Sequence, residues 1–332
     1  MPEMTQARRV LSVLAGQASD RPPVGFWHHF PSNAVSGRAA VEAHLRFLDR
    51  YPVDFLKIMN DNPYPTRRVV QCVADLRSLC VLNGDEAGYG LQLEVIRALA
   101  DALAGEFLLV TTLFNTWTTL RKIVTPPGSD RSRPPVLGGA VAEADRRMHA
   151  LVLEDRTAVA EALHGIAASH ANFVANCLQA GADGIFLSVR EDRVNTPELG
   201  ETTYRDLVEP TDLAILKSAS PARFNILHAC GVPCDLPRLS TYPVHAINWA
   251  DRAGGPCIRE VAGKLDAVIC GGVNNLKTLP SGTPEQVKRE VRDALAQAGD
   301  APMIISPGCT FDPDVVPPAN LDAMIEAVKA CG

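Results

Sequence analysis

Short apolar runs alternate along the chain with longer segments in which apolar residues recur at helical spacing. Eight runs indicate buried strands, because each is short, rich in branched and aromatic residues, and apolar on both faces. These runs are residues 24–27, 55–58, 107–113, 184–188, 224–228, 245–248, 267–271 and 303–306. The segments with helical spacing are residues 37–50, 91–104, 157–180, 204–219, 284–298 and 319–330, preceded by an amphipathic helix within 4–16.

This alternation of strand and helix predicts parallel strands, because a parallel connection needs a long crossover segment. Eight such units predict a single (β/α)8 TIM barrel, an α/β fold that spans residues 1–332 as one domain with an N-terminal helix. An open doubly wound sheet is the alternative, but no Gly-x-Gly-x-x-Gly turn follows the first strand. Residues 115–139 are rich in Pro, Gly and Arg, and we expect them to form an irregular insertion near the mouth of the barrel.

Composition and charge narrow the class of protein. No apolar run reaches the length of about 18 residues that suggests a membrane span, and the N-terminus lacks the apolar core of a secretory signal. We therefore expect a cytoplasmic protein without a membrane partner. The net charge of −6 comes from interleaved acidic and basic residues, which argues against nucleic acid as a partner. Nine cysteines, an odd number in a long chain, favour reduced thiols over a disulfide framework.

The ends of two predicted strands carry donor groups that suit zinc. His228 and Cys230 are two residues apart in a strand, so their side chains point the same way. Cys309 follows the last strand, and a barrel brings its strand ends to one rim. An imidazole with two thiolates is a good donor set for zinc, and three protein ligands leave a fourth position open, as in catalytic zinc sites. A His-x-Cys pattern by itself is weak evidence, so the hypothesis depends on the joint placement.

Other polar residues at strand ends are candidates to bind substrate or to support the metal site. They are His28, His29, Asn60, Asp61, Glu191 and Asp251. For the three carboxylates, the alternative is an ordinary solvated loop residue. For the two histidines, the alternative is that one of them is a core residue whose hydrogen bonds are satisfied. The two asparagines at 60 and 62 would alternatively cap a turn.

Several stretches resemble the uroporphyrinogen decarboxylase superfamily. MTQARRVL at 4–11 and DRPPVGFW at 20–27 resemble the start of that superfamily, and DFLKIMN at 54–60 resembles its second-strand motif. HACG at 228–231 and SPGC at 306–309 resemble the zinc motif of its methyltransferase branch, the methylcobalamin:coenzyme M methyltransferases. PPANLDAM at 317–324 is also similar to that branch. The resemblance spans nearly the whole chain.

The resemblance implies a zinc-dependent enzyme that transfers a methyl group between a corrinoid and a thiol bound to zinc as its thiolate. Under it, His228, Cys230 and Cys309 are the zinc ligands and catalytic residues. The corrinoid is methylcobalamin or is carried by a partner protein, and the other reactant is a small thiol or methyl donor. Two alternatives stay open: a metal-free tetrapyrrole decarboxylase, and a non-catalytic barrel that binds zinc and corrinoid. Against the decarboxylase, FWHHF at 26–30 lacks the arginine expected there, and Cys309 replaces an expected histidine.

Overall fold

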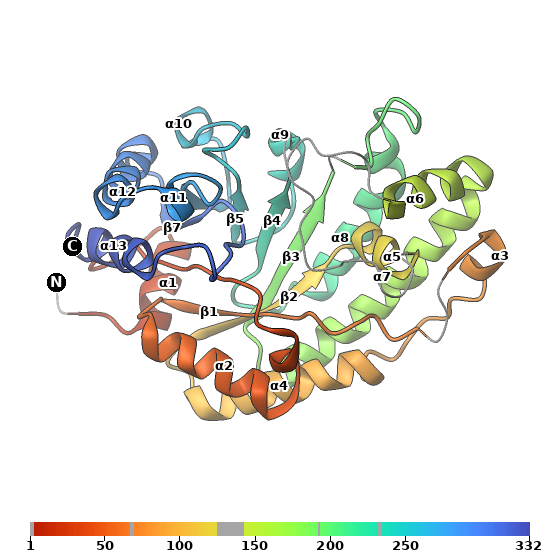
Figure 1. Ribbon diagram of the computed structural model, residues 1–332, viewed down its shortest axis with the longest axis horizontal. Helices are drawn as coiled ribbons and strands as arrows, with labels where there is room; N and C mark the ends of the chain where they lie inside the picture. Colours follow the sequence, from red (N-terminus) through yellow and green to blue (C-terminus); the bar gives the residue numbers. More distant parts are fainter. Residues whose placement is uncertain (1–2, 67–69, 125–142, 192, 232–233) are drawn as a thin grey trace.

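The computed structural model describes residues 3–66, 70–124, 143–191, 193–231 and 234–332. Its centre is one sheet of seven parallel strands, in which each strand pairs with the next one along the chain. The strands are β1 Phe55–Ile58, β2 Leu108–Phe114, β3 Gly184–Arg190, β4 Ile226–Cys230, β5 Ala246–Trp249, β6 Val268–Val273 and β7 Met303–Pro307. The sheet curls into a half-barrel with the helices packed around its outside, a TIM-like α/β fold (Figure 1).

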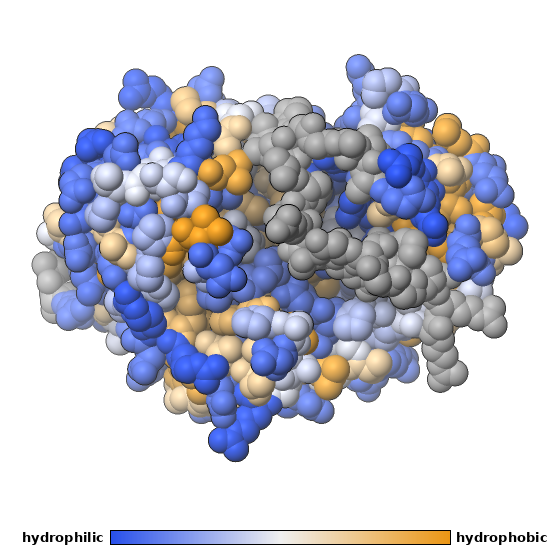
Figure 2. All heavy atoms as spheres, viewed as in Figure 1, coloured by the Kyte–Doolittle hydropathy of each residue, from blue (hydrophilic) through white to orange (hydrophobic). Residues whose placement is uncertain are grey.

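Helices connect successive strands, as the alternating pattern predicts. They are α1 Gln6–Leu14, η1 Ser32–Ala34, α2 Gly37–Arg50, α3 Val73–Leu76, α4 Ala87–Leu103, α5 Thr116–Val124, α6 Glu143–Glu154, α7 Arg156–Gln179, the π-helical turn η2 Tyr204–Val208, α8 Glu209–Ser218, α9 Leu236–Leu239, α10 Ile258–Val261, α11 Thr278–Ser281, α12 Pro284–Ala298 and α13 Pro318–Lys329. Within the described part of the chain, no helix combines the length and the apolar character needed to cross a lipid bilayer. On the face drawn in Figure 2, hydrophobic residues form small separate groups among hydrophilic ones.

The prediction of eight strands is correct for seven of them, and the first predicted strand, residues 24–27, does not form a named strand. Val24 instead makes an isolated parallel bridge with Ile305 of β7. The Gly25 amide donates to the Ile305 carbonyl at 2.9 Å, and the Asp54 amide donates to the Val24 carbonyl at 2.8 Å. Two prolines precede Val24 and have no N–H to donate, so a regular ladder cannot extend through them.

The prediction of an irregular stretch over 115–139 is wrong for its first part. Thr116–Val124 forms helix α5, and Trp117, Leu120 and Val124 are buried along it. Three threonines in this helix obscure its helical spacing, because threonine has a low intrinsic helix propensity. The remainder of the predicted insertion, residues 125–139, lies outside the described residues.

The N-terminal helix α1 covers the inner face of the sheet at the amino ends of the strands. Val10 and Val13 of α1 belong to an apolar cluster with Phe55, Phe224 and other inward-facing strand residues. The buried Arg9 of α1 donates to Asp20 at 2.7 Å and to Asp54 at 2.6 Å, which compensates its charge. Because this end is filled, polar side chains that face inward gather toward the carboxyl ends of the strands, where barrel enzymes carry their chemistry.

Candidate metal centre

A tier of buried polar side chains lines the inner face of the sheet near the carboxyl ends of its strands. Ser188 of β3 pairs in register with His228 of β4, which pairs with Asn248 of β5, which pairs with Cys270 of β6. Residues paired in this way point to the same face of a parallel sheet. Apolar residues such as Phe186 and Ile226 occupy the tier below. The upper tier is therefore a polar site on an apolar floor.

His228, Cys230 and Cys309 lie together at this tier and just beyond it, toward the carboxyl ends of the strands. A ring nitrogen of His228 and the two sulfur atoms are all within 4.8 Å of one another, and Nε2 of His228 lies 3.3 Å from Sγ of Cys309. Strand β4 supplies the first two residues, and the loop after β7 supplies the third. Among the residues that the structure describes, this is the one group of three or more His, Cys, Asp or Glu side chains spaced to hold a metal ion.

A glycine allows the loop that carries Cys309 to approach the sheet. A Cβ atom on Gly308 would lie 2.8 Å from Cα of Ala250 and 3.1 Å from the carbonyl oxygen of Trp249. Both neighbours are backbone atoms just after or at the end of β5, so they cannot move aside easily. The Gly-Cys pair at 308–309 thus brings a sulfur from one end of the sequence to the end of β4.

The two thiols of this group differ in acidity. The Cys309 sulfur accepts a hydrogen bond from Cys230, and this lowers the pKa of Cys309 to about 7 although burial opposes the change. The same interaction, with burial, raises the pKa of Cys230 above its usual range. Of the two thiols, Cys309 is therefore the stronger acid and Cys230 the one that keeps its proton more firmly. A divalent cation that neutralises both sulfurs would displace this proton.

Asn248 determines which nitrogen of His228 faces the sulfurs. Its Nδ2 atom donates to the carbonyl oxygens of Cys270 at 2.8 Å and Pro307 at 3.0 Å, and to Ser306 Oγ at 3.1 Å. Because carbonyl oxygens only accept hydrogen bonds, the amide is oriented with Oδ1 toward His228, 2.5 Å from Nδ1. The proton of the neutral imidazole therefore lies on Nδ1, and the Nε2 lone pair is free toward Cys309.

The sequence analysis did not single out Asn248. The signal that indicates it is a polar residue inside the otherwise apolar run 246–249, on the face of its strand that carries the site. Such a residue, fully buried, needs hydrogen-bond partners from neighbouring strands.

Of the predicted substrate-binding residues, His29 and Asp61 form a pair outside the three-residue group. Nδ1 of His29 lies 2.8 Å from Oδ2 of Asp61, and the His29 side chain is about half exposed. The neighbouring His28 ring instead packs against Phe30 and Phe311, with centroid separations of 4.7 and 5.2 Å. His28 is half-buried beside these rings. Its pKa is lowered, mainly because it is buried.

Asn60 and Glu191 have local partners. Nδ2 of Asn60 lies 3.4 Å from the Thr112 carbonyl oxygen, and Oδ1 accepts from the Asn62 amide at 3.3 Å, the turn-capping contact of the alternative. Glu191 is buried and forms an ion pair with Arg238. Burial raises the pKa of Glu191, although Arg238 acts in the opposite direction.

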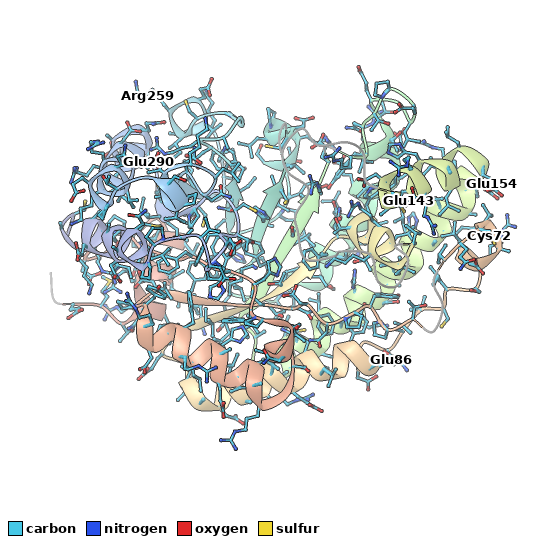
Figure 3. All side chains as sticks on the ribbon, viewed as in Figure 1. Cys72, Glu86, Glu143, Glu154, Arg259 and Glu290 are labelled. Atoms are coloured by element: carbon cyan, nitrogen blue, oxygen red, sulfur yellow. The ribbon has the colours of Figure 1, made fainter. Side chains whose placement is uncertain are left out.

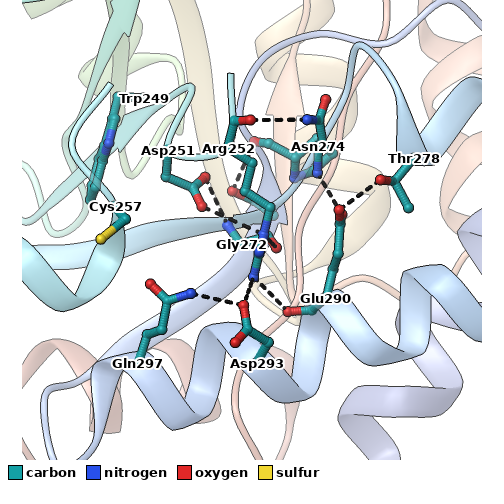
Figure 4. A network of polar contacts seen from close by, with 12 residues as sticks. Trp249, Asp251, Arg252, Cys257, Gly272, Asn274, Thr278, Glu290, Asp293 and Gln297 are labelled. Carbon is teal, nitrogen blue, oxygen red and sulfur yellow. Dashed lines mark hydrogen bonds and ion pairs between the residues drawn. The ribbon is translucent and has the colours of Figure 1, made fainter. Parts of the chain in front are cut away.

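Asp251 belongs to a separate polar network between the end of β5 and helix α12 (Figure 4). It accepts a hydrogen bond from the Gly272 amide at 3.1 Å, and burial raises its pKa to about 6. The adjacent Arg252 donates to the Gly272 carbonyl at 2.5 Å and to Asp293 of α12 at 2.8 Å. This network braces a strand end against a helix. Asp251 is not in the group formed by His228 and the two cysteines.

Three of the other cysteines show no part in this group of ligands. Cys270 is buried in β6, and its thiol lies 3.3 Å from Ser306 Oγ. Cys177 is buried in α7, where burial raises its pKa. Cys72 is exposed next to α3, at the edge of the molecule and far from the inner face of the sheet (Figure 3).

The chain is similar to several known proteins. The model of one protein family, uroporphyrinogen decarboxylase (URO-D), matches residues 51–331. Among curated proteins, the methylated-thiol–coenzyme M methyltransferase of Methanosarcina mazei is 28% identical over 153 residues, which are 46% of this chain and 40% of that protein. The chain thus aligns with less than half the length of that relative.

Two solved structures are similar to the chain at low sequence identity. A methyltransferase from Methanosarcina mazei has a TM-score of 0.74 and 17% identity, and the match covers 99% of both chains. A B12-independent methionine synthase from Shewanella sp. W3-18-1 has a TM-score of 0.47 and 13% identity, over 72% of this chain and 66% of that one. The first likeness supports the TIM-like fold along the whole chain.

Proposed function

The chain belongs to the uroporphyrinogen decarboxylase family, and from this premise we propose that it is a zinc-dependent methyltransferase of the branch that acts on corrinoids and thiols. The observation that carries the proposal is the convergence of one imidazole nitrogen and two sulfurs, from β4 and from the loop after β7, within 4.8 Å. The methyltransferase names of the similar curated protein and of the structure that matches over its full length support the same reaction class.

The donor set fits zinc. In a tetrahedral site with Zn–N near 2.1 Å and Zn–S near 2.3 Å, neighbouring ligand atoms lie roughly 3.6 Å apart. The separation of 3.3 Å between His228 Nε2 and Cys309 Sγ is close to this value. His228, Cys230 and Cys309 would hold the ion, and the fourth position would take the substrate sulfur. Mixed imidazole and thiolate ligands favour zinc over the harder ions magnesium and calcium.

A bound zinc ion would supply the Lewis acidity that keeps a substrate thiol deprotonated at neutral pH. The residues of this chain would orient the ligands, supply charge and exclude water. Asn248 holds His228 with Nε2 toward the site. Cys230 and Cys309 would contribute thiolate charge that keeps a bound sulfur electron-rich, and the apolar floor around Phe186 would exclude water. A thiol held there would take the methyl group of a corrinoid, and the electron pair of the cobalt–carbon bond would stay with the corrinoid.

The proposal includes a corrinoid as methylcobalamin or on a separate partner protein, and a small thiol or methylated thiol as the other reactant. We also propose that residues 23–25 close the half-barrel between β7 and β1. They hydrogen bond to Ile305 of β7 on one side and to Asp54, just before β1, on the other. Closure would give the site a complete wall of strands.

Metal analysis combined with an assay of methylcobalamin demethylation, using a panel of thiols, tests the proposal. We expect about one zinc ion per chain and thiol-dependent loss of the methyl group. Cys309→Ala should lose the zinc and at least about 100-fold of the activity. Cys331→Ala, which alters an exposed cysteine near the C-terminus, is the matched control and should behave like the parent. A Cys309→Ala protein that keeps full activity, or a metal-free protein that decarboxylates a tetrapyrrole, would contradict the proposal.

A further inference from the structure

Lys57 is a charged residue buried inside the sheet. It lies on β1 between Phe55 and Met59, and only 5% of its surface is exposed. Its Nζ atom is 2.8 Å from Sδ of Met59 and 4.5 Å from the centroid of the Phe186 ring. Among the residues that the structure describes, no carboxylate lies within 4 Å of this amine. An ammonium group in such surroundings is costly unless other charges compensate it.

Two of the three groups whose negative charge acts on Lys57 belong to the candidate metal centre. Asp61, and the sulfurs of Cys309 and Cys230 when they are ionised, attract the ammonium group. Phe186 links the two places physically, because its ring packs against that of His228 with centroids 5.3 Å apart. Two further titratable groups lie near the amine, His28 and His44, and Lys57 helps to keep both neutral. Burial lowers the pKa of Lys57 to about 7, so added negative charge nearby would raise it again.

We propose that Lys57 is the internal counter-cation of the thiolate centre, and that it stabilises the negative charge gained when a substrate thiolate joins Cys230 and Cys309. This inference rests on the proposed function. A doubly charged cation with a neutral imidazole and two protein thiolates carries no net charge, and a third thiolate makes the unit anionic. A nearby ammonium in a water-poor interior favours the anionic state over the neutral one. Lys57 thus acts on the affinity for the thiolate and need not touch the rest of the substrate.

Thiol binding to the cobalt(II)-substituted full chain tests this role without any methyl transfer. The probe is 2-mercaptoethanol, whose sulfur adds intensity to the near-ultraviolet charge-transfer band that Cys230 and Cys309 already give with bound cobalt. Lys57→Met removes the charge and keeps a long apolar side chain, and no described carboxylate is left without a partner. We expect thiol binding at pH 7 to weaken about tenfold and its pH midpoint to rise by about one unit. Lys57→Arg should retain most of the affinity, and Lys264→Met, at an exposed lysine, should change nothing.

The outcomes separate this inference from the proposed function. If the parent chain does not bind cobalt, the metal site itself fails. If cobalt binds but 2-mercaptoethanol binds equally well to Lys57→Met and to the parent, the role of Lys57 is overturned and the metal site stands. A second probe, 3-mercaptopropionate, carries a carboxylate. Equal losses for both thiols support the counter-cation, whereas a loss confined to 3-mercaptopropionate assigns Lys57 to the substrate's acid group and overturns it.

Discussion

Nδ1 of His228 lies 2.5 Å from Oδ1 of Asn248, so the imidazole of one strand is anchored by the amide of the next. The amide is itself held by two backbone carbonyls, those of Cys270 and Pro307. Through this contact, residues of β5, β6 and β7 together fix the orientation and the tautomer of His228, a candidate metal ligand. A ligand held in this way does not have to be reoriented when a metal ion binds.

Asn248→Leu should weaken zinc binding by about 10- to 100-fold, because Nδ1 of His228 loses its acceptor and the ring is free to turn. Competition with a chromogenic chelator measures the affinity, and far-ultraviolet circular dichroism checks that the chain stays folded. Asn248→Asp keeps an oxygen opposite Nδ1 and should lose less affinity than the leucine variant. Equal zinc affinity in Asn248→Leu and in the parent would show that the contact does not orient the ligand.

Gly308→Ala should displace the loop that carries Cys309, because the new Cβ would lie 2.8 Å from a backbone atom of Ala250. We expect zinc affinity to fall at least about tenfold with a loss of stability of about 1–3 kcal/mol. Isothermal titration with zinc and urea unfolding measure the two effects. Gly165→Ala on α7, where no atom lies within 4 Å of the added methyl group, is the control and should leave zinc binding unchanged. An unaltered zinc affinity in Gly308→Ala would refute the role given to this glycine.

In the metal-free protein, iodoacetamide should modify Cys309 before Cys230. The pKa of Cys309 is lowered to about 7 by the hydrogen bond from Cys230, and thiolate is the reactive form, so its rate should rise with pH and level off above about pH 8. Mass spectrometry of the peptides follows each cysteine separately. Cys177, which is buried with a raised pKa, should stay unmodified, and added zinc should protect Cys309. Faster modification of Cys230 would reverse the assignment of the thiol and the thiolate.

Asp212 should make the protein less stable as the pH rises from about 4 to 7. It is fully buried, accepts hydrogen bonds from Tyr204 at 2.5 Å and Tyr242 at 3.3 Å, and burial raises its pKa from 3.8 to about 7. The folded state therefore keeps a proton that the unfolded state has lost, and the free energy of unfolding declines by roughly 4 kcal/mol at most over this range.

Urea unfolding of the parent and of Asp212→Asn at pH 5 and pH 8 measures this effect. The asparagine variant should show a smaller fall in the free energy of unfolding, because it cannot ionise. Asp49→Asn, on the exposed side of α2, should keep the pH dependence of the parent. A variant of Asp212 with the same slope as the parent would mean that other groups cause the pH dependence.

The sequence by itself determined the elements that depend on local pattern. Seven strands and the longer helices between them, apart from α5 and α6, follow from apolar runs and helical spacing, because both signals lie within one segment. It also determined that His228 and Cys230 share a face and that Cys309 follows a later strand of the same sheet. These three converge because parallel strands joined by helices end at one edge.

Only the tertiary structure decided how the barrel is joined at residues 24–27 and which roles Asn248 and Lys57 have. These features depend on contacts between segments far apart in the chain. Within residues 24–27, Val24 makes one isolated bridge in place of a strand, and its partners lie on β7 and just before β1. Asn248 acquires its role from backbone oxygens on two other strands. In the sequence, Lys57 is one polar residue in an apolar run. Its proposed role depends on the sulfurs that act on its charge and on the Phe186 ring beside it. Burial and electrostatic attraction depend on distance in space, which local sequence patterns do not encode.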